Sequence, residues 1–235
     1  MKNFVLFFLV IVYCQSLTGQ DLTPNSVSIN NEEGDKLYKE DQFYFGITYL
    51  LLNDLHKDMS QHGFSTGLSI GYIKDIPLNE ERNFGLGIGL GLSSNSLNHN
   101  LKITKSENGI NYEFLDADEF TKNKISTQIL EVPLEIRWRT STPKTYKFWR
   151  IYAGIKLGYL ITANAKFKGG GESLNYTNLD VFEKFNYGLS LSAGYNTWNL
   201  NLYYGLNSIL NNTPIINNEG IKARTINIGL IFYLL

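Results

Sequence analysis

Six charged residues on two neighbouring apolar segments are the strongest candidates for chemistry in this sequence. On each segment the charged residues alternate with apolar ones, so in an extended strand the charged residues of that segment share one face. Opposite charges on such faces form either a salt-bridged structural network or a gated path for ions. We expect the network, because unpaired charges in an interior are costly. The six are Glu131, Glu135, Arg137 and Arg139 in LEVPLEIRWR, and Arg150 and Lys156 in KFWRIYAGIK.

The other candidate sites are weak. The three histidines, His56, His62 and His99, lie in polar stretches but show no HExxH, GxSxG or ordered Ser/His/Asp spacing, so we expect solvated histidines rather than a metal or hydrolytic site. The acidic run 116–119 and the asparagine-rich stretch 211–220 lack the spacing of a calcium loop. The sequence therefore predicts no catalytic residue, no metal site and no cofactor.

Charge and the N-terminal residues restrict the class of protein. The 235 residues carry a net charge of -1, which gives nucleic acid no basic surface to bind. Residues 1–19 have one early lysine, an apolar run and then small or polar residues, the pattern of a secretory signal peptide. Lipid attachment at Cys14, the only cysteine, is the disfavoured alternative, because Tyr13 stands where lipoprotein processing requires a small residue. Residues 20–41 form a polar leader.

From residue 42 to residue 235 the apolar residues recur at every second position, which predicts β-strands. The connections alternate between long polar stretches (52–63, 94–126, 161–183 and 207–222) and shorter ones (74–82, 140–147 and 196–197). Long and short connections therefore lie at opposite ends of the strands. The expected strands are eight segments of about ten residues: 42–51, 64–73, 83–92, 127–140, 149–160, 184–196, 198–206 and 223–235.

Alternation fits both a soluble barrel with an apolar interior and a membrane barrel with an apolar exterior. The second face is mostly Gly, Ser, Asn and Tyr rather than the Lys and Glu of a water-exposed surface, and aromatic residues recur near strand ends. Both features, with the long connections at one end, favour a membrane barrel.

The stretch NFGLGIGLGL, residues 83–92, has glycine at every second position. An eight-stranded barrel has little interior space, so glycines make room for inward tyrosines such as Tyr44, Tyr152 and Tyr203 on other strands. Two other interpretations of this stretch are excluded. A glycine-rich membrane helix does not have a period of two, and a dinucleotide-binding turn would be followed by a helix. We therefore place four glycines in the lumen: Gly85, Gly87, Gly89 and Gly91.

At EVPLEIRWRTSTP, KFWRIYAGIKLGYL and SAGYNTWNLNLYYGLN the sequence resembles the PorT-like outer-membrane barrels of Bacteroidota. The likeness runs from about Gln42 to the C-terminus. The resemblance implies an integral outer-membrane protein needed for type IX protein secretion and, in gliding species, for delivery of surface adhesins. The family has no catalytic residues to transfer. One departure is the terminal Leu235, where many such barrels end in an aromatic residue, although Phe232 and Tyr233 lie nearby.

The sequence thus predicts an all-β, eight-stranded antiparallel transmembrane barrel in the outer membrane, with short periplasmic turns and a plugged lumen. We expect a non-enzymatic accessory or scaffold of type IX secretion, whose partners are outer-membrane lipid and the proteins of a secretion complex. The stretches 94–126 and 161–183 are the expected partner surfaces. A small passive porin, a general surface barrel and a lipid-modifying enzyme are the alternatives.

Overall fold

The computed structural model describes residues 41–107, 109–140, 148–211, 215–216 and 219–234. The expected signal peptide and the expected leader, apart from Asp41, lie outside the described residues. In the part of the chain that is described, no helix is long and apolar enough to cross a membrane.

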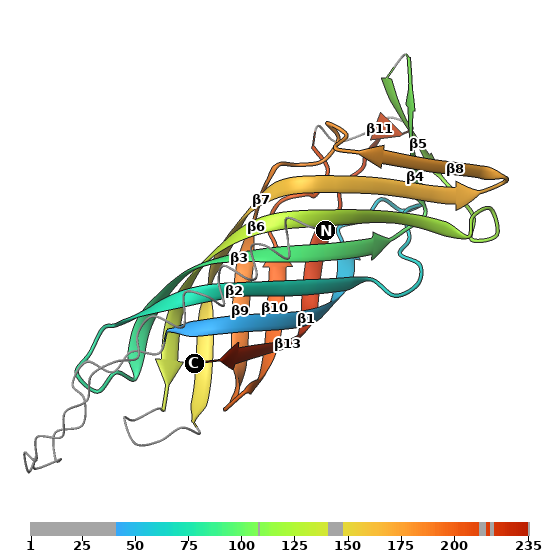
Figure 1. Ribbon diagram of the computed structural model, residues 1–235. Helices are drawn as coiled ribbons and strands as arrows, with labels where there is room; N and C mark the ends of the chain where they lie inside the picture. Colours follow the sequence, from blue (N-terminus) through green and yellow to red (C-terminus); the bar gives the residue numbers. More distant parts are fainter. Residues whose placement is uncertain (1–40, 108, 141–147, 212–214, 217–218, 235) are drawn as a thin grey trace, which may run out of the picture. The chain divides into compact units, whose positions relative to one another are not determined.

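Eight antiparallel strands form a closed barrel (Figure 1), in the order β6-β3-β2-β1-β13-β10-β9-β7, and pairing of β6 with β7 closes it. This confirms the predicted fold class. Closure leaves no free edge in the barrel wall, so every strand there has a neighbour on both sides. The strands are β1 (Gln42–Asn53), β2 (Thr66–Pro77), β3 (Phe84–Asn98), β6 (Lys122–Arg139), β7 (Trp149–Gly169), β9 (Phe185–Tyr195), β10 (Trp198–Gly205) and β13 (Arg224–Leu234).

The two ends of the barrel differ. The turn end carries the short connections 78–83, 140–148 and 196–197, together with the start of β1 and the end of β13. The loop end carries the long connections and the short strands. Those strands are β4 (Leu101–Ser106), β5 (Gly109–Phe114), β8 (Glu172–Thr177), β11 (Ile215–Ile216) and β12 (Glu219–Gly220).

Three strands are much longer at the loop end than the sequence predicted. The lengths of β3, β6 and β7 are 15, 18 and 21 residues. The interpretation of 94–126 and 161–183 as loops is therefore wrong for much of both stretches, which contain strand ends, the β4–β5 hairpin and β8. Outside the lipid the outward residues become polar, so the alternation that marks a membrane strand disappears while the strand continues.

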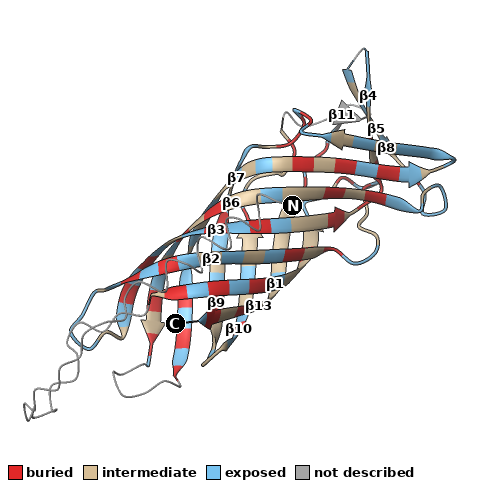
Figure 2. Ribbon diagram, viewed as in Figure 1, coloured by how far each residue is buried: buried red, intermediate tan, exposed pale blue. Residues whose placement is uncertain are grey.

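Exposed residues alternate with buried or half-buried ones along the strands (Figure 2), and in the barrel wall the exposed residues are mostly apolar. Ile70, Leu90 and Leu200 are 60%, 57% and 69% exposed, whereas the alternate residues are buried or half-buried. Such exposure would be unfavourable in water but suits a wall in contact with acyl chains. The predicted orientation of the two faces is confirmed.

Two belts of aromatic pairs border this apolar wall. Trp149 packs on Tyr195 with 5.3 Å between ring centroids at the turn end, and Tyr159 packs on Phe185 at 5.2 Å nearer the loop end. Trp149 and Tyr159 are ten residues apart on β7, about 33 Å along the strand. At a tilt of about 40° this corresponds to about 25 Å across the membrane, the height of the apolar band of outer-membrane barrels.

The glycines of β3 face inward and leave room for large side chains. A Cβ added at Gly87 would come within 2.9 Å of Cδ of Arg137, and one at Gly91 would overlap the Tyr44 hydroxyl. Tyr44 is 2% exposed, so its ring fills the lumen beside β3. The alternating glycines thus provide space for an arginine and a tyrosine that enter from other strands.

Candidate functional site: a lumen closed at both ends

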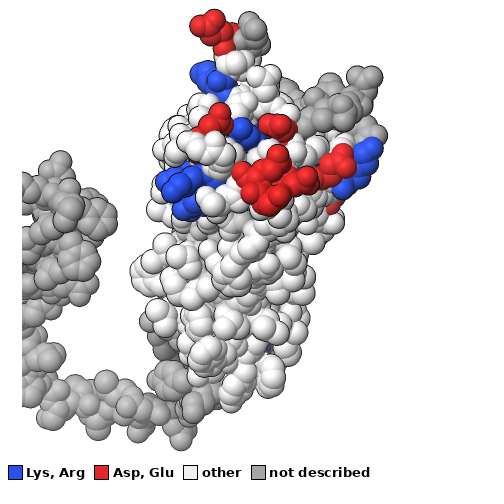
Figure 3. Space-filling view, turned by 90° about the vertical axis from the view of Figure 1, so that its right-hand side faces the viewer, with Lys and Arg blue, Asp and Glu red and all other residues white. Residues whose placement is uncertain are grey.

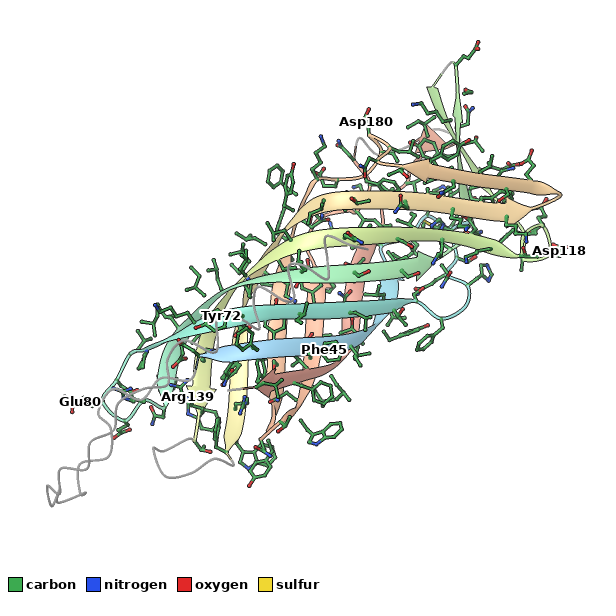
Figure 4. The ribbon with its side chains drawn as sticks, in the orientation of Figure 1. Phe45, Tyr72, Glu80, Asp118, Arg139 and Asp180 are labelled. Carbon is green, nitrogen blue, oxygen red and sulfur yellow. The ribbon has the colours of Figure 1, made fainter. Side chains whose placement is uncertain are left out.

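An ion cluster closes the lumen at the turn end, where Figure 4 labels Arg139. We call this the basal ion cluster: Asp75, Glu135, Arg137 and Arg139. Asp75 on β2 accepts bonds at 2.8 and 2.7 Å from Nη1 and Nη2 of Arg139 on β6, and at 3.2 Å from Nη1 of Arg137. Arg137 also donates from Nε to Glu135 at 3.3 Å. The side chains of Asp75, Arg137 and Arg139 are 0% exposed.

Aromatic side chains fill the space around these charges. The Arg137 guanidinium lies 4.2 Å from the ring centroid of Tyr152, and Tyr152 packs edge-on against Tyr233 at 5.4 Å. Arg150 lies 4.5 Å from the ring of Phe148. Cations over aromatic faces are stabilised by the ring quadrupole, most strongly away from water. The rings therefore help to hold the arginines and block the passage of solutes.

A second ion pair lies nearer the middle of the barrel. Lys156 Nζ on β7 is 3.2 Å from Glu131 Oε2 on β6, and both side chains are mostly buried. A cavity of about 50 Å³ beside this pair is lined by polar residues such as Asn95, Asn186 and Tyr203 and by apolar residues of the loop end. It has room for a few water molecules.

A hydrophobic core closes the lumen at the loop end, and we call it the cap. Its members come from every long connection and from the strand ends beneath them, so the loops pack on one another across the barrel mouth. Burial of these apolar side chains stabilises the described parts of the connections against the barrel mouth. The buried members are Met59, Leu101, Ile103, Ile125, Ala163, Ala165, Leu179, Val181, Phe182, Leu210, Ile221 and Ala223.

The six charged residues of the sequence prediction fall into separate groups. Glu135, Arg137 and Arg139 belong to the basal ion cluster, and Glu131 pairs with Lys156. Arg150 is 3% exposed and contacts aromatic rings rather than joining either group. Across the β6–β7 hairpin the expected meeting of opposite charges is found between Glu131 and Lys156. Arg137 and Arg139 pair instead with Asp75 on β2.

Sequence reasoning missed Asp75, the carboxylate that holds the two arginines together. The sequence prediction ended the second strand near residue 73 and assigned Asp75 to a short turn, whereas β2 continues to Pro77. Asp75 lies two residues beyond Ile73 and four beyond Gly71, on the inward face. The unbroken period of two through this carboxylate was the available signal. Gln42 accepts a bond at 2.7 Å from Arg137 Nη2; it lies within the first predicted strand, but the sequence prediction gave it no role.

The prediction of solvated histidines is wrong for two of the three. His56 and His99 are 8% and 1% exposed, and both lie at the loop end beside the cap. Burial lowers the pKa of His99 to about 4, because the charged imidazolium would lose its water. His99 Nδ1 accepts a bond from the backbone NH of Leu101 at 3.2 Å. His56 Nδ1 lies 3.6 Å from Asp58 Oδ2, and its ring stacks on Phe114 with 5.0 Å between ring centroids.

The acidic run has no metal-site geometry. Residues 116–119 are exposed, and Figure 4 places Asp118 at the loop end. Among the residues that are described, no three His, Cys, Asp or Glu side chains are grouped to hold a metal ion. Part of the asparagine-rich stretch, residues 212–214 and 217–218, lies outside the described residues.

A comparison with protein families matches residues 26–211 to the outer membrane protein beta-barrel domain. The chain belongs to this family. The protein is therefore an outer-membrane barrel, with its turn end in the periplasm and its loop end outside the cell. The match is to the barrel domain in general. A search of curated protein sequences finds none that matches.

Among solved structures, the chain is similar to Ail, the attachment invasion locus protein of Yersinia pestis. The identity is 12%, the alignment covers 83% of this chain and 99% of Ail, and the TM-score is 0.34. Ail in complex with the heparin analogue sucrose octasulfate gives 11% identity, the same coverage and a TM-score of 0.33.

Proposed function

We propose that this protein is a non-conducting, non-enzymatic scaffold in the outer membrane that presents its loop end to partner proteins. The closed lumen is the observation that carries the proposal. Asp75, Arg137 and Arg139 fill the periplasmic end with fully buried charges, and the cap fills the other end with apolar side chains. A barrel without a pore has its function in its surfaces.

The loop end is built as a rigid surface. The strands β6 and β7 extend well beyond the aromatic belt, β8 adds to them, and the cap supports them from inside. Partner proteins bind a preformed surface with a smaller loss of conformational entropy than a flexible loop would require. This favours a role in docking over a role in transport through the barrel.

The resemblance to PorT-like barrels supports a role of this scaffold in type IX secretion. Deletion of the gene tests this role directly, with proteomics of the culture medium as the readout. We expect proteins with C-terminal sorting domains to disappear from the medium, and a plasmid copy of the wild-type gene to restore them. Unchanged export would refute the secretion role.

A general surface barrel, without a secretion role, is the second candidate, and the same closed lumen and rigid loop end support it. In that case the deletion strain would export sorting-domain proteins normally but would change in adhesion. Altered lipid A in the same strain, seen by mass spectrometry, would instead identify a lipid-modifying enzyme.

Conductance separates the scaffold from a passive porin. In planar bilayers we expect the purified protein to give no stable conductance steps, because both ends of the lumen are filled. Channels of uniform size would refute the closed lumen. Channels that appear only after Arg139→Ala would show that the basal ion cluster is the seal.

A further inference from the structure

Four lysines form two directly opposed pairs on neighbouring strands at the extracellular end. In the register of β6 and β7, Lys122 is opposite Lys168 and Lys124 is opposite Lys166. Residues opposite one another in adjacent strands have Cβ atoms about 5 Å apart, so the four ammonium groups share one small area. We call these four residues the lysine face.

A bulge in the strand register places all four on the outside of the sheet. Between Gln128 and Ile129 the register shifts, and Ile161 on β7 has no partner. Beyond this point Ala163 and Ala165 face inward and are buried in the cap, so Lys166 and Lys168 face outward. On β6 the alternation is uninterrupted, since Asn123 and Ile125 are buried and Lys122 and Lys124 lie on the opposite face.

The described part of the chain gives these lysines no acidic partner. No Asp or Glu oxygen among the described residues lies within ion-pair distance of them, and Lys124 Nζ donates to Ser96 Oγ at 3.5 Å. By contrast, Lys102 on the neighbouring hairpin is paired with Glu172 at 3.0 Å. Opposed like charges destabilise a sheet. An arrangement of four is therefore expected to bind an anion from outside the chain.

The position of the lysine face selects the class of anion. The lysine face continues the lipid-facing side of β6. Toward the extracellular end this side changes from apolar residues such as Leu134 to Gln128, Ser126 and then Lys124. Lys124 is six residues beyond Leu130, the partner of Tyr159 in the outer aromatic belt. This places it about 15 Å beyond the apolar band, at the rise and tilt of a barrel strand. Headgroups of ordinary phospholipids end below this level, since the polar layer on each side is about 5–8 Å thick.

Charges of both signs gather at this end of the barrel (Figure 3), while the wall beneath is almost free of them on the face drawn. We propose that the lysine face binds the phosphorylated saccharide of lipopolysaccharide molecules packed against the barrel. The saccharide of this lipid extends outward from the acyl chains that contact the wall, and its phosphates match four adjacent ammonium groups in charge. This binding does not depend on a role in secretion.

Binding of lipopolysaccharide to the purified protein in nanodiscs of neutral phospholipid tests the proposal. The test variant is Lys124→Gln/Lys166→Gln, and the matched control is Lys57→Gln/Lys105→Gln, two exposed lysines elsewhere at the same end. At about 1 kcal/mol per lysine near a charged surface, loss of two should weaken binding about 30-fold. The control should bind like the wild type, and Lys124→Arg/Lys166→Arg should keep most of the affinity.

Three further binding measurements, each with a different anion, identify the chemical group that the lysines recognise. Lipopolysaccharide stripped of its phosphates should bind the wild type no better than the test variant binds the intact lipid. Inorganic phosphate should compete only weakly, and polyglutamate, a probe for acidic proteins, should not bind selectively. Equal affinity of wild type and test variant for lipopolysaccharide would overturn the proposal, as would tighter binding of polyglutamate or of inorganic phosphate.

Thermal stability separates a binding defect from a folding defect. Without lipopolysaccharide, the test variant should melt at or above the temperature of the wild type, because two opposed charges are removed. With lipopolysaccharide, the wild type should gain stability and the variant should gain much less. A variant that is less stable in both conditions would show that the lysines support the fold, which would contradict the proposal.

Discussion

Replacement of Asp75 by alanine should destabilise the barrel more than any other single change in its charged residues. Asp75 is 1% exposed and bonds to both terminal nitrogens of Arg139 and to one of Arg137. The substitution removes the negative charge and leaves two guanidinium groups in a site without solvent. Glu135 accepts a bond from Arg137 Nε at 3.3 Å, and Arg139 Nε donates to the Arg82 carbonyl oxygen at 2.9 Å.

The expected loss follows from the desolvation of the arginines. Removal of one partner from a buried pair costs about 3–5 kcal/mol, because an uncompensated charge remains. The pair of Lys102 and Glu172 provides the control, since the side chain of Glu172 is 59% exposed and water reaches this pair. Glu172→Ala should cost no more than about 1 kcal/mol. The ratio between these two losses tests whether burial determines the effect.

Urea unfolding in lipid vesicles, followed by tryptophan fluorescence, measures both losses. A double-mutant cycle with Arg139→Met isolates the pair: the double variant should be more stable than the sum of the single losses predicts, by about 1–3 kcal/mol. A loss below about 1 kcal/mol for Asp75→Ala, equal to that of Glu172→Ala, would refute a structural role of the basal ion cluster.

Three further predictions concern other parts of the barrel. Gly91→Val should cost about 1–3 kcal/mol in urea unfolding, because the new side chain overlaps Tyr44, and Tyr44→Ala in the same chain should recover part of the loss. Leu202→Arg places a charge on the lipid face and should cost about 2–4 kcal/mol in vesicles. His99 has a pKa of about 4 when folded and of about 6.5 when unfolded, so the unfolded loop end binds the proton more strongly between these values. The stability of the loop end should therefore fall by about 2 kcal/mol from pH 7 to pH 5, measured by hydrogen exchange, and His99→Gln should remove this dependence.

A different result would contradict each of these three predictions. Full stability of Gly91→Val would show that β3 has space to spare beside Tyr44. Unchanged folding of Leu202→Arg would place the apolar face away from lipid. A pH dependence that persists in His99→Gln would assign it to another group.

Alternation predicted the barrel wall because its physical cause is local. Each membrane strand has one face in lipid and one in the lumen, so a period of two identifies the strands. The small and polar residues of the second face and the aromatic residues near strand ends then identify which face is in lipid. The inward glycines opposite inward tyrosines followed from the limited space in an eight-stranded barrel. The positions of Gly91 and Tyr44 were predicted in this way.

The parts that could not be predicted depend on contacts between distant segments. The bonds from Asp75 to Arg139 join residues 64 positions apart, and they form only because the register aligns β2 and β6 with β3 between them. The cap combines short apolar stretches and single residues, such as Met59 and Leu210, that lie far apart in the sequence, so the pattern of any one connection does not predict it. Burial of His56 and His99 follows from the cap, so it could not be predicted before the cap was known.

The distance between the two aromatic belts determines which bilayers suit this protein. An apolar height of about 25 Å is shorter than the hydrocarbon core of a typical membrane, about 30 Å, and suits the thinner outer membrane. A thicker bilayer must compress around the barrel or cover polar residues with acyl chains, at a cost that grows with each ångström of mismatch. Lipids with shorter chains are therefore the natural host for reconstitution, and the cytoplasmic membrane is a poor one even before any sorting machinery acts.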